Sequence, residues 1–204
     1  MLRERSCVVV VATGLLLSAL GVGAVPAAED DLAAAIAAYD RGDYADTFER
    51  LRPLADEGNP HAQFYLGYMY ELGKGVAVDL AQAASLYRDA AEQGLIGAQF
   101  NLGLAYLTGR GVEQDPAKAL EWLRQAAEQG HTRSQYKIAE MYEAGQGTKR
   151  DHVQAYKWFA IAAKERYADA KKRRKRVAKK MDPYDIAEAE MLARQWKQAQ
   201  KENK

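Results

Sequence analysis

The sequence predicts an all-α repeat fold, and two observations support this class. First, the segments 61–96, 97–132 and 133–168 have the same length and align without a gap. Second, each segment contains two stretches in which apolar residues recur every three or four positions, as they do on one face of an α-helix. A constant period of about 20–50 residues is typical of repeat architectures. Because one unit cannot cover its own apolar stripe, each unit must stack on the next.

The middle segment shows how each unit is expected to fold. Ala98 and Leu102 share one face of a predicted first helix. Gly109 follows this helix, and glycine readily adopts the positive φ angle that ends a helix. Asp115 and Pro116 suit the N-cap and first position of a second helix. We expect this second helix to bury Ala119, Leu120, Leu123, Ala126 and Ala127.

This unit resembles the Sel1-like repeat, a relative of the tetratricopeptide repeat. The residues that carry the resemblance are Ala98, Gln99, Leu102, Gly103, Tyr106, Gly109, Gly111, Val112, Asp115, Ala119, Trp122, Ala126, Ala127, Glu128 and Gly130. The resemblance implies a right-handed α/α solenoid that binds proteins or peptides, usually without catalysis. It also implies a role as a periplasmic regulator or assembly factor, as in family members with this layout.

Residues 1–27 have the layout of a secretory signal peptide. A short basic start precedes the apolar run Val8–Leu20, and small residues around Ala27 suit a signal peptidase. We therefore expect cleavage near Ala27 and export to the bacterial periplasm, with an uncleaved membrane anchor as the alternative. Cleavage would remove Cys7, the single cysteine, and a chain without thiols is compatible with an oxidising compartment.

The two ends of the mature chain depart from the repeat. Residues 28–60 form a shortened unit that lacks the glycine loop and looks like an ordinary tetratricopeptide hairpin. Residues 169–204 keep the length of a unit but lose its pattern, and we expect them to form a capping helix pair.

Charge is distributed unevenly along the chain. Residues 28–168 contain 15 basic and 21 acidic residues, whereas residues 169–204 contain 12 basic and 6 acidic residues. The core of the basic excess is a continuous run: Lys171, Lys172, Arg173, Arg174, Lys175 and Arg176. Nucleic acid is not an expected partner of an exported protein, so anionic lipid, an acidic polysaccharide or an acidic protein surface fits this run better. The alternative is a solvated helix face.

The sequence contains no recognisable catalytic motif. It has no G-x-S-x-G elbow, no H-E-x-x-H pair and no phosphate-binding glycine loop. His61, His131 and His152 fall in different repeat columns, so the repeat does not assemble them into a metal site. We expect no cofactor and no enzymatic activity. A cell-envelope hydrolase is the alternative function.

Comparison of the units suggests a binding surface. Four columns of the first helix vary most, and their offsets of 4, 7 and 11 place them on one helical face. We expect this face to line the concave side of the solenoid and to bind a peptide or helix of another envelope protein. The alternative is drift of residues that merely face water. The predicted partner-binding residues, of which Tyr65 and Tyr68 are the expected exposed anchors, are His61, Tyr65, Tyr68, Leu72, Asn101, Leu104, Arg133, Lys137 and Glu140.

Overall fold

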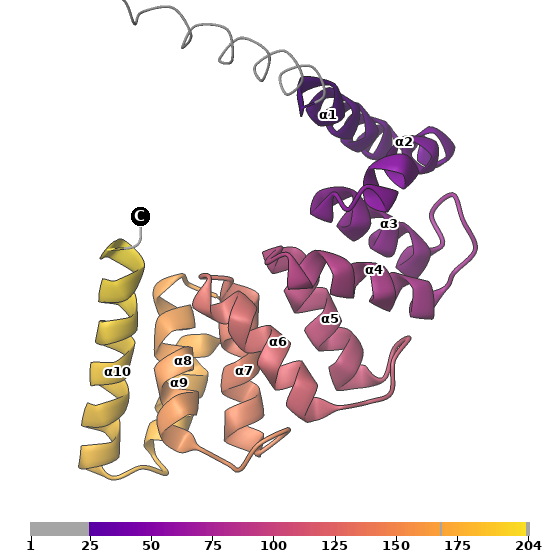
Figure 1. Ribbon diagram of the computed structural model, residues 1–204. Coiled ribbons are helices and arrows are strands. Elements are labelled where there is room, and N and C mark those ends of the chain that lie inside the picture. The colour runs from indigo at the N-terminus through magenta and orange to yellow at the C-terminus, as the bar shows by residue number, and fades with distance from the viewer. Residues whose placement is uncertain (1–24, 168, 203–204) are drawn as a thin grey trace, which may run out of the picture.

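The computed structural model describes residues 25–167 and 169–202, which form ten consecutive α-helices and contain no β-strand (Figure 1). The predicted all-α solenoid is therefore confirmed. The helices are α1 (Val25–Arg41), α2 (Tyr44–Asp56), α3 (Pro60–Leu72), α4 (Leu80–Glu92), α5 (Ile96–Thr108), α6 (Pro116–Glu128), α7 (Thr132–Ala144), α8 (His152–Lys164), α9 (Ala170–Ala178) and α10 (Pro183–Glu202).

Most of the predicted signal peptide, residues 1–24, lies outside the described residues. The expected cleavage site near Ala27 falls in the first turn of α1, which begins at Val25. No helix in the described part of the chain is both long and apolar enough to cross a membrane. Export therefore stays a prediction.

The helices are arranged as a curved row of stacked hairpins (Figure 1). In the three full units each first helix packs against its own second helix, giving the pairs α3/α4, α5/α6 and α7/α8. Each second helix also packs against the first helix of the following unit. All six of these helices have 13 residues, so the constant sequence period corresponds to a constant structural unit.

The predicted helix ends are confirmed. The Asp115 carboxylate accepts hydrogen bonds of 3.1 Å from the backbone N–H groups of Ala117 and Lys118. The bond from the Lys118 N–H is the largest of the effects that lower the pKa of Asp115. Gly109 ends α5 with a φ of 72°, in the left-handed region that favours glycine.

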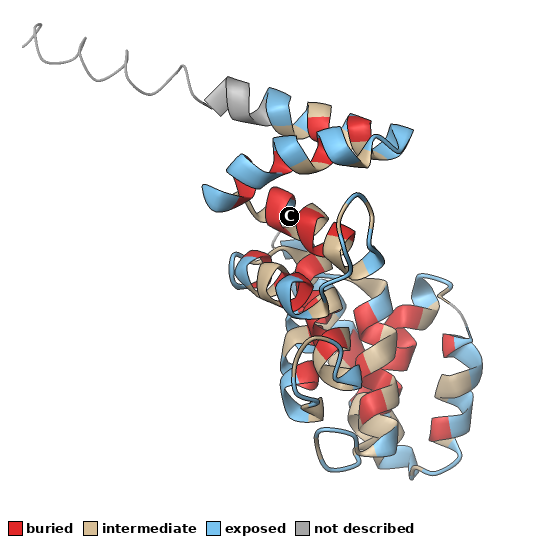
Figure 2. Ribbon diagram, turned by 90° about the vertical axis from the view of Figure 1, so that its right-hand side faces the viewer, coloured by how far each residue is buried: buried red, intermediate tan, exposed pale blue. Residues whose placement is uncertain are grey.

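The interior of the solenoid is built from small residues and aliphatic side chains. Leu102 and Leu123 are fully buried. A Cβ added to Gly103 would lie 2.6 Å from Leu123 Cγ, so this glycine lets the two helices of the unit approach closely. Residues coloured as buried in Figure 2 follow the helix sides that face neighbouring helices. Buried Gln99 and Gln135 donate side-chain hydrogen bonds to the carbonyls of Ala91 and Ala127, which joins successive units.

The C-terminal helices cap the solenoid through α8. Helix α9 packs on α8, as a first helix does on the preceding second helix. Helix α10 also packs on α8, where the rings of Trp158 and Trp196 lie 5.8 Å apart and the Tyr156 hydroxyl donates to Glu190 at 3.1 Å. Within the described residues α9 and α10 make almost no contact with each other. The last unit is therefore an open hairpin.

Candidate partner-binding surface

The first helices α3, α5, α7 and α9 lie next to one another and carry the variable columns; we call this side of the solenoid the first-helix surface. The column that contains Gly97 and Arg133 lies where a first helix contacts the first helix of the preceding unit. A Cβ added to Gly97 would lie 3.1 Å from the Phe64 ring. The Arg133 guanidinium lies 4.8 Å from the centre of the Phe100 ring in the next unit. Arg133, a predicted binding residue, therefore also supports the packing of α7 on α5.

The N-terminal end of this surface is an aromatic cluster, defined as Tyr39, Tyr44, Tyr65, Tyr68 and Lys74. The ring of Tyr39 lies 5.7 Å from that of Tyr65 and 6.3 Å from that of Tyr68. The Lys74 ammonium donates a 2.8 Å hydrogen bond to the Tyr39 hydroxyl and lies 4.6 Å from the centre of its ring. Hydrogen bonds to Tyr39 and Tyr44 raise the pKa of Lys74.

The aromatic cluster corrects one expectation. Tyr65 and Tyr68 are half-buried, and Tyr65 packs against the cluster of buried apolar side chains from α1, α2 and α3. The expectation that both side chains are exposed is therefore wrong, and together with Tyr39 they join α1 to α3. That folding does not require them stays a prediction. Their role in partner binding stays a prediction. Two other predicted residues, His61 and Leu72, are exposed, with Leu72 at 46%.

The middle of the surface contains a pocket of about 140 Å³. Two predicted residues, Asn101 and Leu104, line it from α5. Its other lining residues are Glu71, Leu80, Ala83, Ala84, Ala105, Thr108 and Arg110. Most of these side chains are apolar, and the charged groups come from Glu71 and Arg110. Two of the residues predicted from the comparison of the units therefore lie beside the same cavity.

Glu71 is held in place on the wall of this pocket by two partners. Its Oε1 lies 3.0 Å from an Arg110 guanidinium nitrogen, and its Oε2 accepts a 2.7 Å hydrogen bond from the Tyr87 hydroxyl. Burial of Tyr87 and this hydrogen bond both raise the tyrosine pKa, so the hydroxyl stays protonated and keeps donating. The pocket thus combines an apolar lining with a fixed charge pair.

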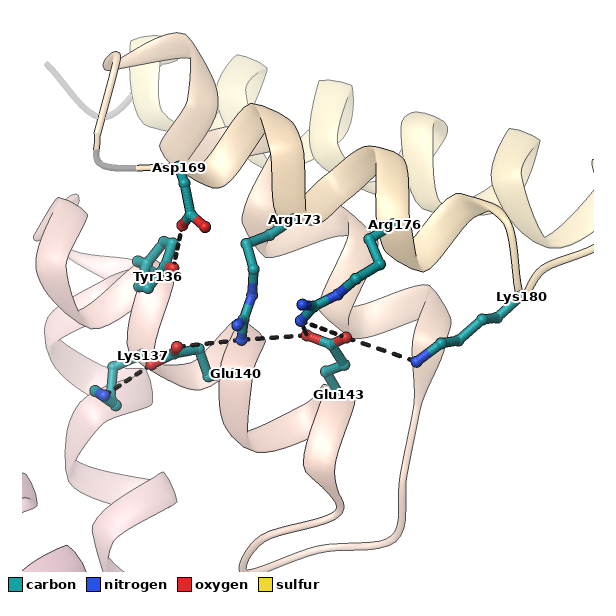
Figure 3. Close-up of polar contacts among 8 residues, drawn as sticks. All are labelled: Tyr136, Lys137, Glu140, Glu143, Asp169, Arg173, Arg176 and Lys180. Carbon is teal, nitrogen blue, oxygen red and sulfur yellow. Dashed lines mark hydrogen bonds and ion pairs between the residues drawn. The ribbon is translucent and has the colours of Figure 1, made fainter.

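The C-terminal end of the surface is an ion-pair network between α7 and α9 (Figure 3). Arg173 bridges Glu140 and Glu143, at nitrogen–oxygen distances of 3.1 and 3.2 Å. Arg176 lies 3.0 Å from Glu143, whose side chain is only 9% exposed. Lys180 lies 3.7 Å from the same carboxylate. These contacts attach α9 to α7.

The network changes the interpretation of several predicted residues. Lys137 forms a 2.7 Å ion pair with Glu140, which also contacts Arg173, so these two candidates are already engaged within the chain. Within the basic run, Arg173 and Arg176 are already engaged in ion pairs with α7, although the Arg176 side chain is 53% exposed. Arg174 lies 5.6 Å from the centre of the Tyr156 ring. The remaining residues of the run, Lys171, Lys172 and Lys175, are exposed.

Sequence reasoning missed the residues that connect neighbouring units. Glu143 pairs with Arg176 and Glu140 with Arg173, and both pairs are 33 positions apart. The Tyr136 hydroxyl donates to Asp169 across the same interval. Burial and this hydrogen bond raise the pKa of Tyr136 to about 12. A search for opposite charges at this spacing would have detected the network.

The described residues offer no group of three or more histidine, cysteine, aspartate or glutamate side chains arranged to hold a metal ion. His131 packs its ring 4.8 Å from that of Phe100, and its Nδ1 lies 2.8 Å from the Ser134 hydroxyl. Burial, followed by the charge of Arg133, lowers the pKa of His131. This histidine is part of the packing between α5 and α7.

Comparisons with known proteins agree with the architecture. The Sel1 repeat family model matches residues 60–95, 96–131 and 132–167, which are 108 of the 204 residues. A Sel1 repeat protein from Oxalobacter formigenes is 36% identical with a TM-score of 0.63, over 66% of this chain and 54% of that one. A protective antigen present in uropathogenic Escherichia coli strains, displaying an SLR fold, is 31% identical with a TM-score of 0.56. That match covers 74% of this chain and 40% of the antigen.

The chain thus spans about half the length, or less, of these two structures. No curated protein matches it. Sel1-repeat proteins generally mediate protein–protein interactions, and their solenoid scaffold is typically non-catalytic. On the three matched repeats and the architecture they form, this chain belongs to the Sel1 repeat family.

Proposed function

We propose that the protein is exported to the bacterial periplasm and acts there as a non-catalytic scaffold or regulator. It binds a peptide or helix of another envelope protein along the first-helix surface, with the pocket beside Asn101 and Leu104 as the main point of contact. The layout of residues 1–27 supports export. The repeat family supports a protein partner in general terms.

The pocket is the observation that carries this proposal. Interfaces gain most of their binding free energy where a side chain of one partner fills a desolvated pocket of the other. A volume of about 140 Å³ and an apolar lining suit one aliphatic side chain of a partner segment. Arg110, whose side chain is 52% exposed, lies at the edge where it can meet a carboxylate or carbonyl of that segment.

The repeat itself suggests how to block the pocket without unfolding the protein. Asn101 shares its column with Tyr65, Lys137 and Arg173, so this position accommodates long side chains in the other units. Asn101→Lys should therefore fold normally and place an ammonium group at the pocket. Ala81→Lys is the matched control, because it adds the same charge at an exposed position of α4.

The test is affinity capture from the cell envelope of the source bacterium, with the captured proteins identified by mass spectrometry. The Asn101→Lys variant should lose at least about tenfold of the partner signal, which corresponds to about 1.4 kcal/mol. The Ala81→Lys variant should retain it. Equal capture by both variants would exclude the pocket as the binding site. Intact-mass analysis of the same sample tests export, for which we expect a chain that starts near Ala28.

A further inference from the structure

One side of α9 that is covered in the full units is open in the last unit. In the full units the column of Gly67, Gly103 and Ala139 faces the second helix of the same hairpin, as the close approach of Gly103 to Leu123 shows. In α9 this column contains Lys175, which is exposed. Helix α10 packs on α8 and leaves α9 uncovered. The position that a second helix occupies in each full unit is therefore open beside α9.

Four lysines line this open position, which we call the α9 slot: Lys171, Lys172, Lys175 and Lys179. All four are exposed, and together with Asp169, Arg173 and Arg176 they line a groove of about 740 Å³ along the helix. Lys171 stands in the column of Gln99, which is only 3% exposed and whose Oε1 accepts a 2.8 Å hydrogen bond from Gln129 at the end of its own second helix. The slot therefore replaces a buried contact of the repeat with lysine side chains, whose aliphatic stems can pack while their charges stay at the edge.

The four slot lysines carry positive charge, and Asp169, the one carboxylate that lines the groove, already accepts a hydrogen bond from the Tyr136 hydroxyl. Residues 171–180 contain eight basic side chains, and the carboxylates of α7 pair with Arg173, Arg176 and Lys180. Among the described residues, none of the four slot lysines forms an ion pair with an acidic side chain. Like charges three or four positions apart on a helix repel each other and destabilise it. An anionic partner would offset this repulsion between the lysines.

Helix α9 is nevertheless held firmly. Ala170 and Val177 are fully buried, and Arg173 and Arg176, at the edge of the slot, form ion pairs with Glu140 and Glu143 of α7. The lysines are therefore presented in a fixed row on a packed element. A partner that matches their spacing need not order the surface first, which favours binding.

We propose that the α9 slot binds an acidic α-helix of a protein partner, which completes the open hairpin. The contact between α7 and α9 shows the chemistry on which this rests: carboxylates at i and i+3 of one helix, Glu140 and Glu143, receive the basic side chains of the next. A helix is favoured over a lipid surface because the vacant place is the one that a second helix occupies in each full unit. This site is separate from the pocket beside Asn101.

The experiment uses the protein as the expressing cell processes it and a labelled synthetic peptide of about 15 residues, long enough to form a helix. The peptide consists of alanine, leucine and glutamate, with glutamates three or four positions apart. A second peptide of the same length and charge has two central prolines that prevent helix formation. Fluorescence anisotropy measures both affinities, and circular dichroism reports helix formation on binding. Heparin and vesicles of anionic phospholipid are measured in parallel.

Three variants locate the binding. Replacing Lys171, Lys175 and Lys179 by glutamine should weaken binding of the helical peptide at least about tenfold. The matched control replaces the exposed Lys149, Lys164 and Lys197 by glutamine, which removes the same charge and should change the affinity by no more than about twofold. Asn101→Lys should leave binding of the helical peptide unchanged. A result against the α9 slot can therefore be distinguished from a result against the pocket beside Asn101.

The slot variant is expected to melt at the same temperature as the natural protein or slightly higher, since it loses repulsion between lysines. Lys175→Ala, which restores the residue of the equivalent position 139, provides a second and milder change. Equal losses in the two triple variants would contradict the proposal, as would equal affinity for the proline-containing peptide. Binding of heparin or anionic vesicles without binding of the helix would replace the proposed occupant by a polyanion.

Discussion

Gly109 and Gly111 belong to the same loop and have almost the same φ, 72° and 74°, but their surroundings differ. A Cβ at Gly109 would come no closer than 3.3 Å to Gln114, whereas one at Gly111 would lie 1.9 Å from the carbonyl oxygen of Leu80. Gly109 is thus required for its backbone angle alone. Gly111 is required also because the loop rests against the helix of the preceding unit.

This difference predicts that alanine at the two positions lowers the free energy of unfolding by different amounts. Gly109→Ala should lower the free energy of unfolding by about 1 kcal/mol, the typical cost of a positive φ for alanine. Gly111→Ala should cost more, because backbone must move as well. Gly130→Ala, at a φ of 93° with open space around it, is the control for the angle alone. Chemical denaturation measures all three, and equal midpoints for positions 109 and 111 would show that the loop does not touch α4.

At His131 the fold favours the neutral ring. Its pKa is lowered by burial and then by Arg133, so the unfolded chain binds a proton more readily than the folded one. This contribution to stability is complete above the ordinary histidine pKa of about 6.5 and is lost as the pH falls through the folded pKa. His131→Leu, which introduces the residue of the equivalent position 95, removes the titration.

The natural protein should therefore lose more stability than His131→Leu between pH 7.5 and pH 5.5, on either side of about 6.5. Denaturation at the two pH values gives the four free energies of unfolding that are needed. His61 and His152 are present in both proteins, so the difference between them isolates His131. Identical pH dependence of the two proteins would mean that this ring is as accessible to protons in the folded as in the unfolded chain.

At the level of the helices, the attachment of α9 depends on one carboxylate. Glu143 lies within 4 Å of Arg173, Arg176 and Lys180, and its side chain is 9% exposed. Most exposed ion pairs contribute little, but a largely buried carboxylate shared by three cations is a different case. Without its charge, the cations of α9 would repel one another and lose their anchor on α7.

Glu143→Gln should accordingly destabilise the protein by about 1.5–3 kcal/mol, the range for hydrogen bonds that involve a charged group. Hydrogen exchange should accelerate most in α9. Glu121→Gln, at an exposed position of α6, removes the same charge and should leave exchange in α9 unchanged. If both variants exchange like the natural protein, α9 is held by Ala170 and Val177 alone.

At the scale of the whole molecule, the period in the sequence was sufficient to predict the regular part. The repetition of Asp115 and Gly109 in their columns determines where helices begin and end, because caps act locally. The burial of Tyr65 and Tyr68 could not be predicted in this way. It depends on Tyr39 in the shortened first unit, whose position relative to α3 follows from packing and not from the period.

The C-terminal end shows the same limit. The pairing of Arg173 with Glu140 and Glu143 joins two units, whereas the comparison of columns treats each unit separately. The packing of α10 on α8 escaped prediction because residues 169–204 have lost the glycine columns, with Met181 and Pro183 in their place. Of the proposed surface, the sequence identified Asn101 and Leu104, while Glu71 and Arg110 emerged only from the folded chain.

The pocket on the first-helix surface is proposed to contact a partner in the cell envelope. Site-specific photo-cross-linking in living cells tests this proposal most directly, with the reactive residue at Thr108 beside the pocket or at the exposed Ala117 of α6. A third protein carries it at Lys175 in the α9 slot. We predict a discrete cross-linked species from position 108 that is absent from position 117. A cross-link equally strong from position 117, or one formed from position 175 alone, would contradict the assignment of the pocket as the binding site.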